Sequence, residues 1–177
     1  YEYCEREIKR NFSELGVGEA KWIMNNYNEI YGGSPKEFPE KYIGPTPIIY
    51  RSSWEHKFMI WCDKNDKVLK WSSEPVEIKY WYRKDNKAHN YYPDFYFKQL
   101  QQDGTEKEYL VEIKPKSQIQ PPEMPKTKSK KALDSFKFLA EQYVKNMDKY
   151  NAAKEYATSR GWNFIILTEE TIKNGLR

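Results

Sequence analysis

Residues 91–114 read YYPDFYFKQLQQDGTEKEYLVEIK, and this stretch decides the fold. Two segments rich in aromatic and β-branched residues flank the turn QQDGTEK, in which Asp-Gly is a hairpin signal. A turn centred near Asp103 places Asp94 directly opposite Glu112, with Cβ atoms about 5 Å apart. Side chains alternate along a strand, so Lys114 projects from the same face as Glu112. We therefore expect two carboxylates and one lysine to converge on one patch.

Facing carboxylates repel each other unless one is protonated or a cation lies between them. A site with few protein oxygen ligands and several waters suits Mg²⁺, and Mn²⁺ is expected to substitute for it. Such an ion polarises a phosphoryl oxygen and lowers the pKa of a bound water. Lys114 is suited to orient that water or to offset charge on the phosphate. The predicted reaction is hydrolysis of a phosphodiester.

The alternative interpretation is a surface hairpin with ordinary cross-strand ion pairs. Glu-x-Lys is a common pattern on polar strand faces, and this chain contains a second copy, because residues 76–79 also read VEIK. No acidic residue precedes that first copy on a paired strand. The position of the second copy, one short hairpin after Pro93-Asp94, is what favours the catalytic interpretation.

The remaining pattern predicts an α/β fold with the element order α-β-β-β-α-β. A helix is expected to begin at Ser52 or Ser53, both good N-caps, with its apolar side chains at helical spacing. After the loop 115–128 we expect two consecutive helices, separated near Asp148 and ending at Gly161. The expected strands are residues 76–82, 91–100, 109–114 and 163–168, with a further short one at 68–71, and a last helix covers about 169–176. The predicted core is a mixed central sheet flanked by helices.

The N-terminal part of the chain is expected to form a separate arm. Residues 1–30 show two short helical patterns, and residues 31–47 contain three glycines and four prolines, which predicts an extended linker. We therefore predict an arm at 1–47 and the catalytic domain at 48–177. No apolar stretch approaches the roughly 20 residues of a bilayer-spanning helix, so no membrane partner is expected.

Positive charge is concentrated in one segment. The chain carries a net charge of +4, and the segment 114–131 contains six lysines and one glutamate. A local basic excess is what a phosphate-binding surface requires, although a solvated loop would look the same. The residues predicted to contact DNA are Arg51, Lys116, Gln120, Lys126, Lys128, Lys130 and Lys131.

Pro93-Asp94 followed by Glu112-Ile113-Lys114, within this element order, resembles the PD-(D/E)xK nuclease superfamily. The resemblance implies a restriction-endonuclease-like fold and a Mg²⁺-dependent DNA endonuclease, with Asp94 and Glu112 as metal ligands and Lys114 as catalytic lysine. It also implies that an acidic residue of the first core helix completes the site, and Glu55 occupies that position. The alternative for Glu55 is a solvated glutamate that interacts with the helix dipole.

A narrower resemblance rests on an ordered series of motifs between about residue 27 and about residue 172. The motifs are YRSSWE at 50–55, EIKPK at 112–116, QPP at 120–122 and ILTE at 166–169. They are similar to the head-completion nucleases of T-even-type tailed phages. This implies action on phage DNA ends during head completion, with portal or neck proteins as partners, in the cytoplasm of the infected host cell and in the virion. The second hypothesis is a structural neck or portal adaptor, or a plug, that keeps the nuclease fold without requiring catalysis.

Overall fold

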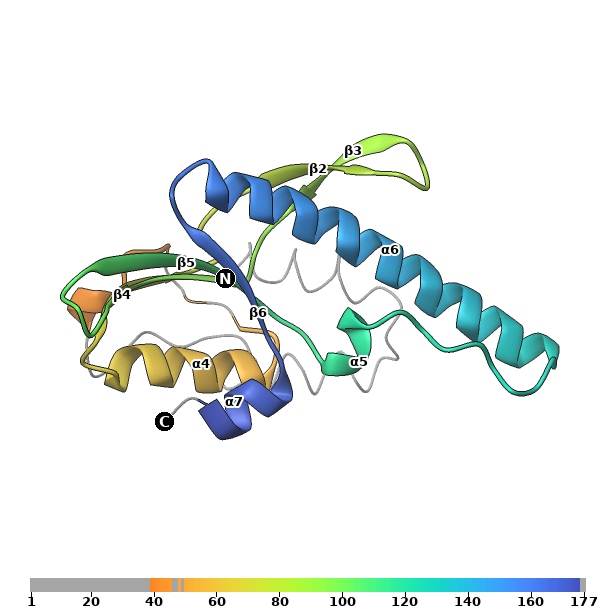
Figure 1. Ribbon diagram of the computed structural model, residues 1–177, viewed down its shortest axis with the longest axis horizontal. Coiled ribbons are helices and arrows are strands. Elements are labelled where there is room, and N and C mark those ends of the chain that lie inside the picture. Colours follow the sequence, from red (N-terminus) through yellow and green to blue (C-terminus); the bar gives the residue numbers. More distant parts are fainter. Residues whose placement is uncertain (1–38, 46–47, 49, 176–177) are drawn as a thin grey trace, which may run out of the picture.

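A four-stranded sheet with a helix on each face forms the centre of the molecule (Figure 1). The computed structural model describes residues 39–45, 48 and 50–175. The strands are β1 (Val68–Ser73), β2 (Ile78–Tyr82), β3 (Lys87–Tyr91), β4 (Phe95–Leu100), β5 (Glu106–Ile113) and β6 (Asn163–Leu167). The helices are η1 (Pro39–Lys41), α4 (Ser53–Lys64), α5 (Lys116–Ile119), α6 (Lys130–Thr158) and α7 (Glu169–Gly175).

The central sheet has the order β1-β4-β5-β6, and its register is the one that the turn sequence predicts. Strand β4 pairs with β5 antiparallel, with Phe95 opposite Val111, so Asp94 continues the ladder opposite Glu112. The connecting turn places Gly104 at a φ of 82°, a conformation that glycine adopts without strain. Strand β6 then pairs with β5 in parallel, after the crossover through α6. The mixed sheet that the sequence predicts is confirmed.

The two faces of β5 belong to two different cores. Val111 and Ile113 lie in the larger core, where Phe58 of α4 packs against Phe95 of β4, 4.9 Å between ring centroids. Leu110 faces the opposite side and packs among small and aromatic residues of α6. Because side chains alternate, Glu112 shares the α6 side with Leu110. The strand therefore carries its carboxylate to the face that α6 covers.

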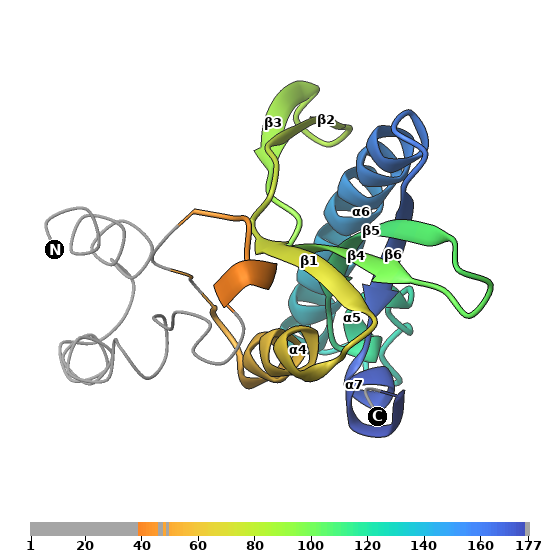
Figure 2. The same cartoon turned by 90° about the vertical axis from the view of Figure 1, so that its left-hand side faces the viewer.

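The strand predicted at 76–82 is not part of the central sheet. Strand β2 pairs instead with β3, and this two-stranded sheet stands beside α6 (Figure 2). The polar turn after Tyr82 leads straight back into β3, so β2 finds its partner locally. Strand β1 lies next to β4 in the central sheet, where we expected residues 76–82, and pairs with β4 antiparallel. The predicted order α-β-β-β-α-β holds with β1, β4 and β5 as its strands and the β2–β3 hairpin inserted.

Helix α6 is continuous, which corrects the prediction of two helices separated at Asp148. The Asp148 carboxylate does not cap a helix; it accepts hydrogen bonds from the Arg83 Nε at 2.6 Å and from the Arg83 backbone N–H at 3.1 Å. Lys84 makes a second ion pair to the same helix, with Glu141 at 2.6 Å. These contacts attach the β2–β3 hairpin to α6.

Most of the predicted N-terminal arm, residues 1–38, lies outside the described residues. Residues 39–45, which the composition assigns to the linker, contact the body of the protein. Lys41 Nζ donates to the backbone carbonyls of Asp63 and Asn65, each at 3.0 Å, and the Tyr42 ring lies against Trp71. The domain boundary at residue 47 stays a prediction. Within the described ranges, no helix combines the length and the apolar character that a bilayer crossing demands.

Candidate active site

Asp94, Glu112 and Lys114 come together where β4 begins and β5 ends. The Glu112 side chain is 2% exposed, and its Oε1 lies 3.0 Å from the Lys114 Nζ. The Asp94 Oδ2 accepts a hydrogen bond from the Ile113 backbone N–H at 2.7 Å, which fixes this carboxylate against β5. The trio predicted from the hairpin register is therefore assembled by the backbone of two neighbouring strands.

The charges in this cluster are not balanced. Burial, and then the nearby Glu112 carboxylate, raise the pKa of Asp94 well above its ordinary value, although Lys114 acts in the opposite direction. Burial disfavours the charge on Lys114, but Glu112 and Asp94 outweigh it, and the pKa of Lys114 is raised. Within this trio, one lysine thus faces two buried carboxylates. With both carboxylates ionised, the trio has an excess of negative charge that a cation would offset.

The donor set fits a hard divalent cation that keeps several waters. Asp94 Oδ1 accepts no hydrogen bond within the part of the chain that the structure describes, so this oxygen is open to a ligand. In the same ranges, His, Cys, Asp and Glu form no group of three that would hold a metal ion. Two carboxylates with water in the other positions are what Mg²⁺ accepts, whereas an all-protein cage is not. Asp94 and Glu112 would hold such an ion.

The carboxylate of Glu55 accepts hydrogen bonds at the N-terminus of its own helix, α4. Its Oε2 accepts from the Arg51 backbone N–H at 2.8 Å, and its Oε1 accepts from the Ser52 hydroxyl at 2.8 Å. The Ser52 Oγ in turn accepts from the Glu55 N–H at 3.2 Å, so Glu55 and the N-cap Ser52 cap the start of α4 together, in a variant of the capping box that uses the Arg51 N–H. The Glu55 charge still acts on Asp94 and on Lys114. Glu55 is therefore an electrostatic neighbour of the site, and its role as a metal ligand stays a prediction.

Three residues that no motif indicates also surround Glu112. The Tyr91 hydroxyl donates to Glu112 Oε2 at 2.6 Å, and Lys149 Nζ lies 5.4 Å from the centroid of the Tyr91 ring. The Glu112 and Asp94 charges also act on Tyr150, whose buried hydroxyl has no hydrogen-bond partner among the described residues. Burial raises the pKa of Tyr91 and lowers the pKa of Lys149.

A weak signal for the α6 residues exists in the sequence. Ala153 and Ala157, two small residues one turn apart, are fully buried against the sheet. Tyr150 precedes Ala153 by three positions and therefore shares its helix face. This spacing identifies the covered face of α6, but it does not reveal which strand residue lies beneath Tyr150.

The residues predicted to contact DNA fall into two groups. Arg51 forms an ion pair with Glu74, and Lys116 forms one with Glu170 at 3.1 Å, so both already have acidic partners. The others are exposed and follow the loop from α5 to the start of α6: Gln120, Lys126, Lys128, Lys130 and Lys131. Their contact with DNA stays a prediction.

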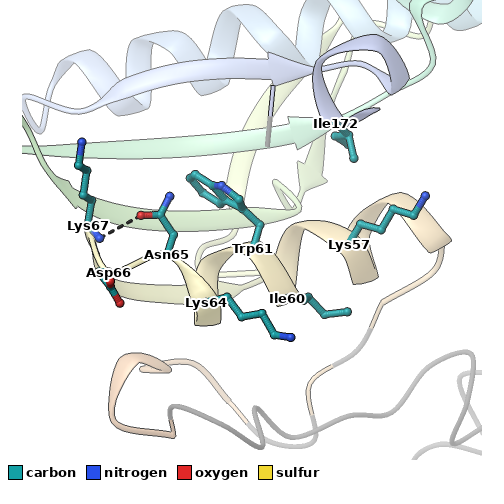
Figure 3. Close-up of a pocket in the computed structure, with 8 residues that line it drawn as sticks. All are labelled: Lys57, Ile60, Trp61, Lys64, Asn65, Asp66, Lys67 and Ile172. Atoms are coloured by element: carbon teal, nitrogen blue, oxygen red, sulfur yellow. Dashed lines mark hydrogen bonds between the residues drawn. The ribbon is translucent and has the colours of Figure 1, made fainter. Parts of the chain in front are cut away.

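A groove of about 610 Å³ lies away from the carboxylates (Figure 3). It runs along α4 beside α7 and is lined by Lys57, Ile60, Trp61, Lys64, Asn65, Asp66, Lys67 and Ile172. None of the predicted catalytic residues contributes to it. The carboxylate cluster instead lies on the opposite face of the sheet, where β4 begins and β5 ends.

Comparison with known proteins identifies nucleases as relatives of this chain. A family model described as TnsA-like endonuclease N terminal matches residues 65–169, a span that includes Asp94, Glu112 and Lys114 but not Glu55. The head completion nuclease of Enterobacteria phage T4 is 35% identical over 154 residues, which cover 87% of this chain and 93% of the phage protein. No solved structure matches the chain.

Proposed function

This chain belongs to the family of TnsA-like endonucleases of the PD-(D/E)xK type, and on that premise we propose that it is a metal-dependent DNA endonuclease acting in phage head completion. The observation that carries the proposal is the meeting of Asp94, Glu112 and Lys114 on one sheet face. A structural hairpin gains nothing from burying an excess of carboxylate charge, whereas a phosphodiesterase needs that charge to hold its cation.

Mg²⁺ is the proposed cofactor, with Asp94 and Glu112 as its protein ligands and Mn²⁺ as an effective substitute. The bound ion supplies Lewis acidity at a phosphoryl oxygen and a more acidic water. The open Asp94 Oδ1 and the excess of negative charge support this assignment. Glu55 is proposed to contribute through its charge, while its oxygens remain at the N-terminus of α4.

The chain's own residues orient the reacting groups. Tyr91 holds Glu112 in place through a buried hydrogen bond. Lys114 keeps its proton because two carboxylates face it, so it stays an ammonium at neutral pH. In that form it donates a hydrogen bond to the attacking water or to the phosphate, and it offsets the charge that grows in the transition state.

Cleavage of linear, nicked and branched DNA in the presence of Mg²⁺ or Mn²⁺ tests the proposal. Wild-type protein is expected to cut at least one of these substrates, and chelation of the metal is expected to stop the reaction. Asp94→Ala is expected to be inactive yet folded, because the residue lies at the edge of the core. Wild-type protein that leaves all three DNA forms intact with either metal would refute the proposal.

The stage of action is proposed from the phage relative, whose name places it in head completion. We expect the substrate to be phage DNA ends, met in the infected cell and in the virion, with portal or neck proteins as partners. The yield of infectious particles in cells that supply only the Asp94→Ala protein tests whether catalysis is needed there. A normal yield would mean that the contribution to head completion is structural.

A further inference from the structure

We propose that Lys149 of α6 is a second catalytic lysine, which binds the scissile phosphate together with the hydroxyl of Tyr150. This inference rests on the proposed function and adds to it a second side of the phosphate site. The strand lysine, Lys114, approaches the carboxylates from the sheet, whereas Lys149 approaches them from the helix that covers the sheet.

The position of Lys149 follows from a short chain of contacts. Its Nζ lies 5.4 Å from the Tyr91 ring centroid, and the Tyr91 hydroxyl bonds Glu112 at 2.6 Å. The charges of Glu112, Lys114 and Asp94 all act on Lys149. The ammonium is therefore half-buried one tyrosine away from Glu112, within reach of the charges of the proposed metal ligands.

Lys149 has no anionic partner within the described residues. Glu112 already receives Lys114 at its Oε1 and Tyr91 at its Oε2, so both of its oxygens have donors. No hydrogen bond or ion pair to Lys149 occurs in the same part of the chain. An ammonium has three hydrogen-bond donors, and burying them in part is unfavourable unless an anion accepts from them. A DNA phosphate is the anion that a nuclease brings to this place.

Tyr150 supplies an independent second observation. Its side chain is 6% exposed, and its hydroxyl is buried without a partner among the described residues. An unsatisfied buried hydroxyl costs about 1–3 kcal/mol, so such groups normally find a partner. Glu112 and Asp94 act electrostatically on this hydroxyl, which puts it at the same centre. Lys149 and Tyr150 together present a cation and a neutral donor to one oxygen-rich ligand.

Lys145 offers a matched control on the same helix. It lies one turn before Lys149, is also half-buried, and its Nζ lies 5.7 Å from the ring centroid of Tyr82. Tyr82 belongs to the β2–β3 hairpin and has no bond to Glu112. The two lysines therefore share a helix, a burial class and a cation–aromatic contact, and they differ in whether that contact leads to the carboxylates.

The experiment compares wild type, Lys149→Met and Lys145→Met in single-turnover cleavage of DNA with Mg²⁺ or Mn²⁺. Methionine keeps an apolar stem against the tyrosine ring. Lys149→Met is expected to lower the rate at saturating enzyme about 100-fold, with the half-saturating concentration changed less than about threefold. Lys145→Met is expected to stay within about threefold of wild type in both quantities.

Lys149→Arg and Tyr150→Phe complete the set. Arginine retains the charge, so Lys149→Arg is expected to cleave DNA at least about tenfold faster than Lys149→Met. A purely structural role of Lys149 would not require this difference. Tyr150→Phe removes only the hydroxyl and is expected to lower the rate about tenfold without lowering the melting temperature.

The outcomes separate the two proposals. Wild-type protein without activity overturns the nuclease function and this inference with it. Active wild type, with Lys149→Met and Lys145→Met indistinguishable, overturns the inference alone. A change in half-saturating concentration without a change in rate also overturns it, because Lys149 would then bind DNA without acting on the transition state.

Discussion

The tetrapeptide Val-Glu-Ile-Lys occurs twice in this chain, and its two copies behave differently. In the first copy, residues 76–79, the glutamate and the lysine are exposed and only the isoleucine is buried. In the second copy, residues 111–114, the glutamate is 2% exposed and the lysine is half-buried. Four identical residues thus give a solvated strand edge in one place and a charged, buried cluster in the other.

Two neighbouring tyrosines show how close the copies lie. Tyr91 bonds Glu112 of the second copy, whereas the hydroxyl of Tyr92 bonds Glu77 of the first. Tyr91 is the last residue of β3 and is buried, whereas Tyr92 follows the strand and is exposed, so one reaches the site and the other reaches solvent. The sequence of a motif therefore does not define a catalytic group. The surroundings of each copy depend on the strand that it pairs with and on the helix that covers it.

The largest expected contrast is between Glu112→Gln and Glu77→Gln. Glu112→Gln is expected to lower the DNA cleavage rate about 1000-fold or more, equivalent to about 4 kcal/mol, because a neutral amide is a poor ligand for a divalent cation. Glu77→Gln is expected to leave the rate within about twofold, since its side chain is exposed. Both rates are measured under single-turnover conditions with Mg²⁺.

Lys114→Ala and Lys79→Ala make the same comparison for the lysines of the two copies. Lys114→Ala is expected to lower the DNA cleavage rate, and Lys79→Ala is expected to leave it unchanged. Equal losses in the two glutamine variants would end the distinction between the copies. Circular dichroism of each variant ensures that a rate loss is not a folding loss.

The tyrosine pair gives a smaller effect. Tyr91→Phe is expected to lower activity about tenfold, the scale of losing a hydrogen bond that orients a metal ligand, and to weaken Mg²⁺ activation in a metal titration. Tyr92→Phe removes the bond to the exposed glutamate and is expected to change neither quantity. If Tyr91→Phe matched wild type at every Mg²⁺ concentration, the hydrogen bond to Glu112 would have no functional role.

The smallest expected effect is on stability without metal. The pKa of Asp94 is raised in the folded state, so the folded protein holds this proton to higher pH than the unfolded chain does. The free energy of unfolding then falls as pH rises above the ordinary pKa range of an aspartate. At neutral pH without metal, the protein is therefore destabilised by the Asp94 charge. Asp94→Asn is expected to raise the melting temperature in chelator by about 2–4 °C, as about 1 kcal/mol does at this size.

Glu77→Gln is the control for that measurement and is expected to leave the melting temperature unchanged. Mg²⁺ is expected to remove the advantage of Asp94→Asn, because the ion stabilises only the wild-type carboxylates. An Asp94→Asn protein that melts below wild type in chelator would show that the carboxylate charge is favourable even without an ion.

The hairpin and its register could be predicted because local signals agree there. The Asp-Gly turn sets the pairing, and alternation then places Asp94, Glu112 and Lys114 on one face. The assignment of 76–82 to the core failed for a local reason too, since its turn sequence favours pairing with the next strand rather than with the central sheet.

The helical half of the site could not be predicted. Asp148 is a good N-cap by type, yet it lies inside a continuous helix because Arg83 satisfies its carboxylate from a different element. Likewise, Lys149 reaches the centre only through the rotation of α6, which the packing of Ala153 and Ala157 on the sheet determines. The alanine spacing marks the covered face of α6, but it does not reveal which strand residue that face meets. For Glu55, the Ser-x-x-Glu spacing in fact indicates the N-terminal capping interaction that forms with Ser52.

The backbone of Lys114 has a consequence for the order of events during synthesis. Its N–H donates to the carbonyl of Leu167 at 3.0 Å, so the last strand of the sheet fixes the backbone of the proposed catalytic lysine. A ribosome adds about 5–20 residues per second, and Leu167 follows Lys114 by about 3–10 seconds. Throughout that interval β5 is an edge strand, and the helix that carries Lys149 is unfinished or unanchored. The growing chain therefore contains both carboxylates of the cluster before it can align Lys114 and Lys149 beside them.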